Sequence, residues 1–262
     1  MSRYSDHKST TQILKNIEAS PNNYFLIHYS CEDFINNPEG KTSRITSIAI
    51  KSIMTGQVES FSMHKTAELK NIALGEISEK YDEIEKDMLE EYFAFLERNG
   101  NNSYYLHINM RDINYGFKAI EHRGKVLGLS PFILADCQKI DLANLLKKRF
   151  GDKYISHPRL EKLCELNNIN TIGYLKGHEE AEAFVKGEYV KLHKSTLAKV
   201  EMYSNIINAA INNTLKTNAK WYDIYGLTFQ GVYKFITSTW WLSLILWIIS
   251  VIISFYIGEI LK

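Results

Sequence analysis

The chain has 262 residues, with 31 Lys and Arg against 30 Asp and Glu, which gives a formal net charge of +1. A charge this close to zero excludes a global attraction to nucleic acid or anionic lipid, so any such binding requires a local patch. The three cysteines Cys31, Cys137 and Cys164 have no CxxC spacing, which indicates free thiols in a reducing compartment.

The secondary-structure pattern alternates strands and helices and predicts an α/β fold. A polar extension over residues 1–21, without the apolar stretch of a secretory signal, precedes the first strand. Strands are predicted where apolar and β-branched residues cluster between turn residues: Asn23–Ser30, Arg44–Met54, Gln57–Met63, Ser103–Asn109 and Phe132–Asp136. Helices are predicted where apolar residues recur at helical spacing or where Pro and Gly mark helix ends: Ser78–Arg98, Asp112–Arg123, Ile140–Arg149, Pro158–Asn167, Glu179–Lys186 and Val190–Leu215.

The last segment, 235–262, is predicted to be a membrane anchor. No charged residue occurs from Phe235 to Gly258, and a run of about 20 apolar residues in a helix is long enough to cross the hydrocarbon core of a bilayer. Trp240, Trp241 and Tyr256 would mark the two interfaces. The aromatic segment 218–234 suits the headgroup layer. We therefore expect a single-pass protein of the cell inner membrane, with a domain over 22–217 in the cytoplasm.

Two stretches of the chain resemble the DEDD 3′–5′ exonucleases of the ribonuclease H-like superfamily. RITSIAIKSIMTGQVESFSM is similar to that family's second and third strands, and FILADCQKIDLANLLKKRFGDKYISHPRLEKLCELNNI is similar to the stretch around its fifth strand and the following helix. The resemblance covers about residues 22–212 and implies a ribonuclease H-like mixed sheet flanked by helices. It also implies a site in which four acidic residues hold two divalent metal ions.

Most of those acidic residues are missing from this chain. The resemblance places His28 and Ser30 where the family has Asp-x-Glu, and Ala198 where it has an Asp five residues after a His, here His193. Only Asp112 stands at a matching acidic position, which makes it the one candidate catalytic residue. Losing three of four acids removes most of the charge that retains two Mg²⁺ ions. The resemblance therefore implies a catalytically degenerate domain, with a divalent metal ion as the one cofactor left open.

Imidazole and basic groups stand at or near the positions of the lost acids. The predicted ligand-binding residues are His28, His107, Asn109, Arg111, Asp112, His193, Lys194 and Lys199. If the resemblance holds, the three histidines converge in the family's cleft, where they and the Arg and Lys side chains could bind a nucleotide phosphate or one transition metal ion. The alternative is that each histidine is an ordinary core or surface residue, which is the more common case without H-x-H spacing.

Three functions of different class follow from this pattern. The first is a membrane-anchored module that binds a nucleotide or single-stranded nucleic acid and does not cleave it. The second is an active metal-dependent nuclease or phosphodiesterase with relocated acids, for which the candidates are Glu32, Asp33, Asp112 and Glu201. The third is a membrane-perturbing effector that forms homo-oligomers through its anchor, where Ser243, Ser250 and Ser254 share one helix face. By analogy alone, such an architecture is typical of bacterial antiviral defence proteins.

A run of glutamates near the last long helix has two interpretations. Glu179, Glu180, Glu182 and Glu188 could replace the missing metal ligands. The more common role of such a run is the solvated face of a helix, which an N-terminal position favours through the helix dipole. We expect the solvated face.

Overall fold

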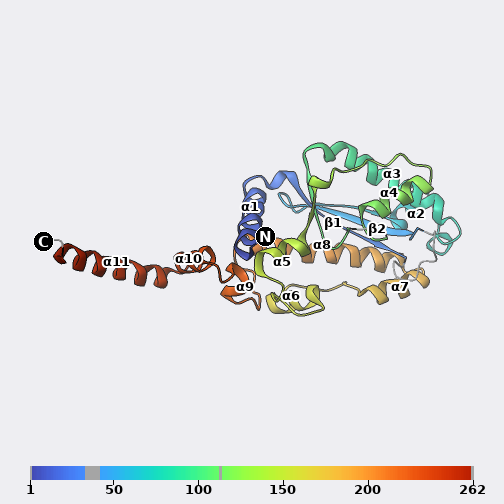
Figure 1. The fold of residues 1–262 in the computed structure, drawn as a ribbon. Coiled ribbons are helices and arrows are strands. Elements are labelled where there is room, and N and C mark those ends of the chain that lie inside the picture. Colours follow the sequence, from blue (N-terminus) through green and yellow to red (C-terminus); the bar gives the residue numbers. More distant parts are fainter. Residues whose placement is uncertain (1, 33–41, 112–113, 261–262) are drawn as a thin grey trace.

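The computed structural model describes residues 2–32, 42–111 and 114–260, which form an α/β body with a helical tail (Figure 1). The body contains one mixed five-stranded sheet in the order β3-β2-β1-β4-β5. Its strands are β1 (Tyr24–Cys31), β2 (Ile45–Ser52), β3 (Val58–Ser62), β4 (Tyr104–His107) and β5 (Lys139–Asp141). The first three strands pair antiparallel, whereas β4 is parallel to both β1 and β5. The predicted α/β class with a mixed sheet and flanking helices is confirmed.

Helices cover both faces of this sheet (Figure 1). They are α1 (Arg3–Ala19), α2 (Met63–Leu69), α3 (Tyr81–Asn99), α4 (Phe117–Val126), α5 (Leu142–Phe150), α6 (Arg159–Asn167), α7 (Gly177–Val185), α8 (Tyr189–Ile211), α9 (Trp221–Tyr225), α10 (Phe229–Ser238) and α11 (Trp240–Ile260). The chain also forms short 3-10 turns at Pro21–Asn23, Leu74–Glu76, Gly100–Asn102 and Asp136–Gln138.

The alternation of side chains along β1 divides the core into two parts. Ile27 and Tyr29 point to the face covered by α3 and α4, whereas Leu26 points to the face covered by α8, α5 and α1. Because both faces are covered, seven of the eight residues of β1 are buried. This explains why the strand appears in the sequence as a mostly apolar run rather than as an alternating pattern.

The structure differs from the predicted elements in several places. The helix predicted at Asp112–Arg123 begins at Phe117, and the first two residues of the predicted range lie outside the described part of the chain. Residues 132–136 were expected to form a strand, but the fifth strand is Lys139–Asp141, which pairs parallel with β4. Leu134 nevertheless enters the core on the α3 face, so the apolar run is explained by burial without strand pairing. The polar segment 1–21 contains α1, whose Leu14 and Ile17 pack into the core on the α8 face.

The C-terminal tail begins at α9 and leaves the body beside the N-terminus (Figure 1). Its last helix includes a 20-residue stretch, Trp240–Glu259, that is apolar and long enough to cross a membrane, and none of this stretch is buried. The predicted apolar segment at 235–262 is divided, because Phe235 belongs to α10 and the helix ends before Thr239 adopts an extended backbone. The structure therefore confirms an exposed apolar C-terminal helix.

Candidate functional site: a cavity at the carboxyl ends of two parallel strands

A cavity of about 870 Å³ opens where β1 and β4 end. Its walls come from the end of β1, from the segment after β4, and from α7 and α8. From β1 the chain continues into the hairpin β2–β3 on one side, while β4 lies on the other side after α3. Ligands of open α/β sheets bind in the crevice at such a reversal of strand order, outside the carboxyl ends of the strands. This topology makes the cavity the first candidate for a ligand site.

His28 contributes a neutral imidazole to this cavity. Its Nδ1 lies 3.3 Å from the hydroxyl of Tyr203 and 3.4 Å from that of Tyr115. Complete burial, and to a lesser degree the positive charge of Lys199, lower the pKa of His28 well below its usual value. Its Nε2 is buried and has no hydrogen-bond partner among the described residues. A buried nitrogen without a partner is costly, and Nε2 of His193 is in the same state.

The charged centre of the cavity is an ion pair between α7 and α8. Oε2 of Glu180 accepts from Nζ of Lys199 at 2.7 Å. Its other oxygen, Oε1, accepts from the hydroxyls of Ser195 at 2.7 Å and Ser30 at 3.0 Å. Both charged side chains are about one-tenth exposed. With these three partners, the carboxylate is fully hydrogen-bonded inside the protein.

The charges around the cavity do not favour a phosphate in its interior. The charged side chains among the described lining residues are Glu32, Glu180, Glu182 and Lys199. Three carboxylates against one ammonium group repel a phosphate. Phenol and amide groups supply most of the other polar side chains of the lining. Within the described part of the chain, no group of three or more His, Cys, Asp or Glu side chains is placed to hold a metal ion.

Three of the predicted ligand-binding residues line the cavity together: His28, Asn109 and Lys199. Asn109 follows β4 and has a left-handed backbone with φ of 58°. Arg111 lies beside it, because its Nη2 donates to Oδ1 of Asn109 at 3.1 Å while its Nε pairs with Asp141. The ion pair with Asp141 raises the pKa of Arg111, whose side chain is about half exposed. The predicted residue Lys194 does not line this cavity.

The three predicted histidines do not meet in one cleft. Leu26 of β1 is paired in register with Leu106 of β4, so the two residues point to the same face of the sheet. His28 is two residues after Leu26, whereas His107 is one residue after Leu106, so their side chains point to opposite faces. The prediction that the three histidines converge is therefore wrong. His28 and His107 stand an odd number of positions apart in the register of the two strands, and such an offset puts their side chains on opposite faces of the sheet.

The other two histidines have neighbours of their own. The ring of His107 contacts Phe117 at a centroid distance of 5.4 Å, and its Nδ1 accepts from the backbone N–H of Met110. The ring of His193 lies 5.0 Å from that of His64. Burial lowers the pKa of both His107 and His193 to about 4, so both imidazoles are neutral near pH 7.

The relocated acids are only partly described. Asp112, the candidate catalytic residue, and Asp33 lie outside the described residues. Glu32 lines the cavity. Glu201 pairs instead with Lys51 of β2, and its side chain is about half exposed.

Glu180 was not expected in the site, because its glutamate run was assigned to a solvated helix face. The side chains of the run separate: Glu179 accepts from the backbone N–H of Lys176 at the start of α7, and Glu188 pairs with Lys191. Glu180 turns inward, on the same helix face as the buried Ala183. The i, i+3 spacing of these two residues was a signal available in the sequence.

Comparison of the chain with protein-family models, with curated proteins and with solved structures found no match.

Proposed function

We propose that the chain is a membrane-anchored protein of the cell inner membrane that binds a nucleotide, or the end of a single-stranded nucleic acid, without cleaving it. The observation that carries the proposal is the cavity at the reversal of strand order. The hairpin-rich mixed sheet supports the resemblance to ribonuclease H-like exonucleases, in which the corresponding end of the sheet holds the substrate. The apolar helix α11 would anchor the protein, with the body in the cytoplasm.

The lining of the cavity suits a nucleoside better than a phosphate. Tyr115, Tyr174 and Tyr203 border it with aromatic side chains, and Asn109 adds an amide. Such groups contact bases and sugars by stacking and hydrogen bonding. The carboxylates of the interior would keep a phosphate at the mouth, where Arg111 lies beside Asn109 with its side chain about half exposed. Arginine binds phosphate oxygens well because its planar fork matches their geometry.

The absence of cleavage follows from the side chains at the positions that the resemblance assigns to metal-binding acids. Those positions carry His28, Ser30 and Ala198. The charge of the nearby Glu180 is balanced by Lys199, and its other oxygen accepts from two hydroxyls, which leaves it little capacity to hold a divalent ion.

The test is equilibrium binding of AMP and of a short single-stranded oligonucleotide to the full chain in detergent micelles, with a chelator present. Asn109→Gly removes the amide but keeps a residue that tolerates positive φ, and it should weaken binding about tenfold, which corresponds to the loss of one hydrogen bond of about 1.4 kcal/mol. Asn168→Gly is the matched control, because Asn168 also has positive φ, of 54°, and lies at the end of α6. Equal affinity in the two variants, or no binding by the unmodified protein, would refute the proposal.

The same sample distinguishes the enzyme. Incubation of a labelled oligonucleotide with Mg²⁺ or Mn²⁺ should leave it intact. Cleavage that requires the metal and disappears in Asp112→Ala would establish the nuclease instead.

A membrane-perturbing effector remains the third candidate, with oligomers formed through α11. In the structure the hydroxyls of Ser243, Ser250 and Ser254 donate to backbone carbonyls of their own tail, those of Ile236, Trp247 and Ser250. These hydroxyls are thus satisfied without a second helix. Leakage of dye from vesicles that contain the protein, abolished by deletion of 235–262, would favour this function.

A further inference from the structure

Arg3 connects the segment before the apolar helix to the body through hydrogen bonds. Its Nε donates to the carbonyl oxygen of Asp223 at 2.6 Å and its Nη2 to that of Ile224 at 2.9 Å, both in α9. Its Nη1 donates to the carbonyl oxygen of Lys148 at the end of α5, also at 2.9 Å. One guanidinium thus joins α1, α5 and α9.

A second contact fixes the same junction. The ring of His7 lies 4.8 Å from that of Tyr225, and His7 also contacts the carbonyl oxygen of Arg149. Gly226 follows with φ of 78°, and a Cβ there would approach Cβ of Arg3 to 2.9 Å. The chain between the body and α10 is therefore packed, which places the first turns of α1 beside α10.

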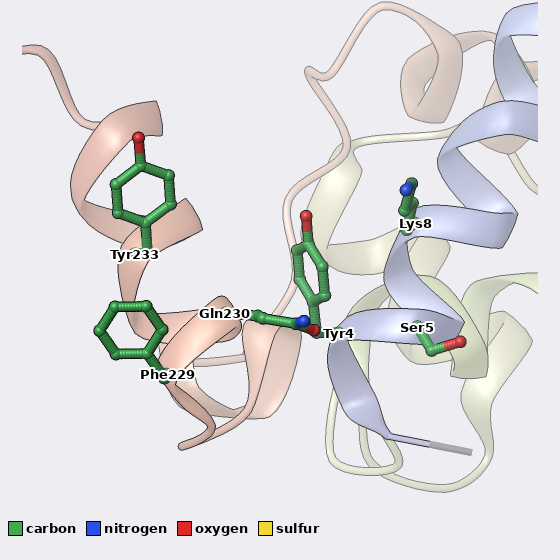
Figure 2. A pocket seen from close by; sticks show the side chains of 6 residues that line it. All are labelled: Tyr4, Ser5, Lys8, Phe229, Gln230 and Tyr233. Atoms are coloured by element: carbon green, nitrogen blue, oxygen red, sulfur yellow. The ribbon is translucent and has the colours of Figure 1, made fainter.

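Between α1 and α10 lies a second cavity, of about 420 Å³ (Figure 2). Tyr4, Ser5 and Lys8 line it from α1, and Phe229, Gln230 and Tyr233 line it from α10. It combines one ammonium group with hydroxyls and an amide, together with three aromatic rings. A positive charge and hydrogen-bond donors beside apolar rings match the two parts of a phospholipid at the level of its phosphate.

The surroundings of this cavity are suited to lipid rather than to water. Phe229 is 87% exposed and Leu227 77% exposed. Large apolar side chains exposed together in this way mark an interaction surface. α10 leads within two residues into α11, so these side chains lie a short distance from Trp240 at the start of the apolar helix. Lys234 of α10 adds a second cation, close enough to His7 to help lower its pKa.

Resting on the proposed membrane anchoring, we propose that this cavity binds the headgroup of an anionic phospholipid. Lys8 contacts the phosphate, and Phe229 and Tyr233 insert beside it into the interfacial layer. The rigid junction at Arg3 then transmits the contact to the body, so an anionic membrane surface fixes the orientation of the whole protein.

The test uses the full chain in nanodiscs of phosphatidylcholine alone and in nanodiscs with about 30% phosphatidylglycerol. Lysine acetylation followed by mass spectrometry should modify Lys8 at least threefold more slowly in the anionic discs, whereas Lys86, an exposed lysine on α3, should react equally in both. Equal reactivity of Lys8 in both discs would overturn the proposal. Protection of Lys8 by inorganic phosphate in phosphatidylcholine discs, to the same extent as by phosphatidylglycerol, would overturn the assignment to a lipid.

A charge reversal separates this site from the general attraction of a basic surface. In Lys8→Glu, amide hydrogen exchange over residues 2–12 should lose its dependence on phosphatidylglycerol, whereas Lys86→Glu should keep it. An unchanged dependence in Lys8→Glu would also overturn the proposal. Resistance of the protein to extraction from vesicles at alkaline pH is measured separately. Extraction there refutes the anchoring and with it the headgroup site, whereas resistance to extraction combined with equal reactivity of Lys8 in both discs refutes the headgroup site alone.

Discussion

Replacing Lys199 by Met should destabilise the body by about 3–5 kcal/mol, because it leaves the buried carboxylate of Glu180 without its ion-pair partner. The two groups are 2.7 Å apart and about one-tenth exposed, so water from the cavity can replace the ammonium group only in part. The hydroxyls of Ser30 and Ser195 still donate to the carboxylate, which places the expected loss near 3 kcal/mol. For a body of this size, such a loss lowers the unfolding midpoint by at least about 6 °C.

Thermal unfolding of the full chain, followed by circular dichroism in one detergent, measures this loss. The matched control is Lys194→Met, five residues earlier on α8 and exposed, which should change the free energy of unfolding by less than about 0.5 kcal/mol. Adding Glu180→Gln to Lys199→Met removes the stranded charge and should recover at least about 2 kcal/mol. A shift below about 2 °C for Lys199→Met, or a double variant that loses the sum of the two single losses, would refute the reasoning.

Two further predictions concern stability. The pKa of His7 and of His193 is lowered from 6.5 to about 4 in the folded protein, mainly by burial, so the unfolded chain binds protons that the folded chain does not. The contribution of these two histidines to stability should therefore be complete above pH 6.5 and decline toward pH 4. Urea titrations at several pH values should show a free energy of unfolding that falls with pH in this range, with a slope that His193→Leu reduces by up to about 1.4 kcal/mol per pH unit. Gly124→Ala should destabilise by about 1–2 kcal/mol, since a Cβ there would lie 2.7 Å from the ring of Phe93. Gly75→Ala, with nothing within 4 Å of its Cβ, serves as the control, and equal unfolding midpoints would contradict this account.

Helices that bury one apolar stripe, and strands that are buried on both faces, were predictable from the sequence. α3 buries Ile84, Met88 and Leu89 at helical spacing, and the strands predicted at Arg44–Met54 and Gln57–Met63 contain β2 and β3. The exposed apolar C-terminal helix was predictable by length and composition alone. In these cases the local sequence carries the information, because the spacing and length of the apolar runs record how each element is placed.

The missed elements depend on distant partners. β5 contains only Lys139–Asp141 and exists because β4 offers it a parallel edge. α1 buries His7 and Thr10 in addition to two apolar residues, so its inner face resembles a solvated one. Both elements form because of tertiary contacts that their local sequence patterns do not reveal.

The candidate site was predictable only in part for the same reason. His28, Asn109 and Lys199 share the cavity as expected. His107 does not, because the face it occupies depends on how β4 is aligned with β1, and the two strands are about 70 residues apart in the chain. Glu180 joins Lys199 only through the packing of α7 on α8, which no short motif records.

The bonds of Arg3 have a practical consequence for experiments on the intact protein. Since the start of α1 is held against α9, a fluorophore or affinity peptide attached ahead of Arg3 would emerge next to the tail, on the side of the body from which α10 and α11 extend (Figure 1). The residues of α7 that border the larger cavity lie at the other end (Figure 1). Such a label would leave that opening accessible to bulky molecules while reporting on events at the tail.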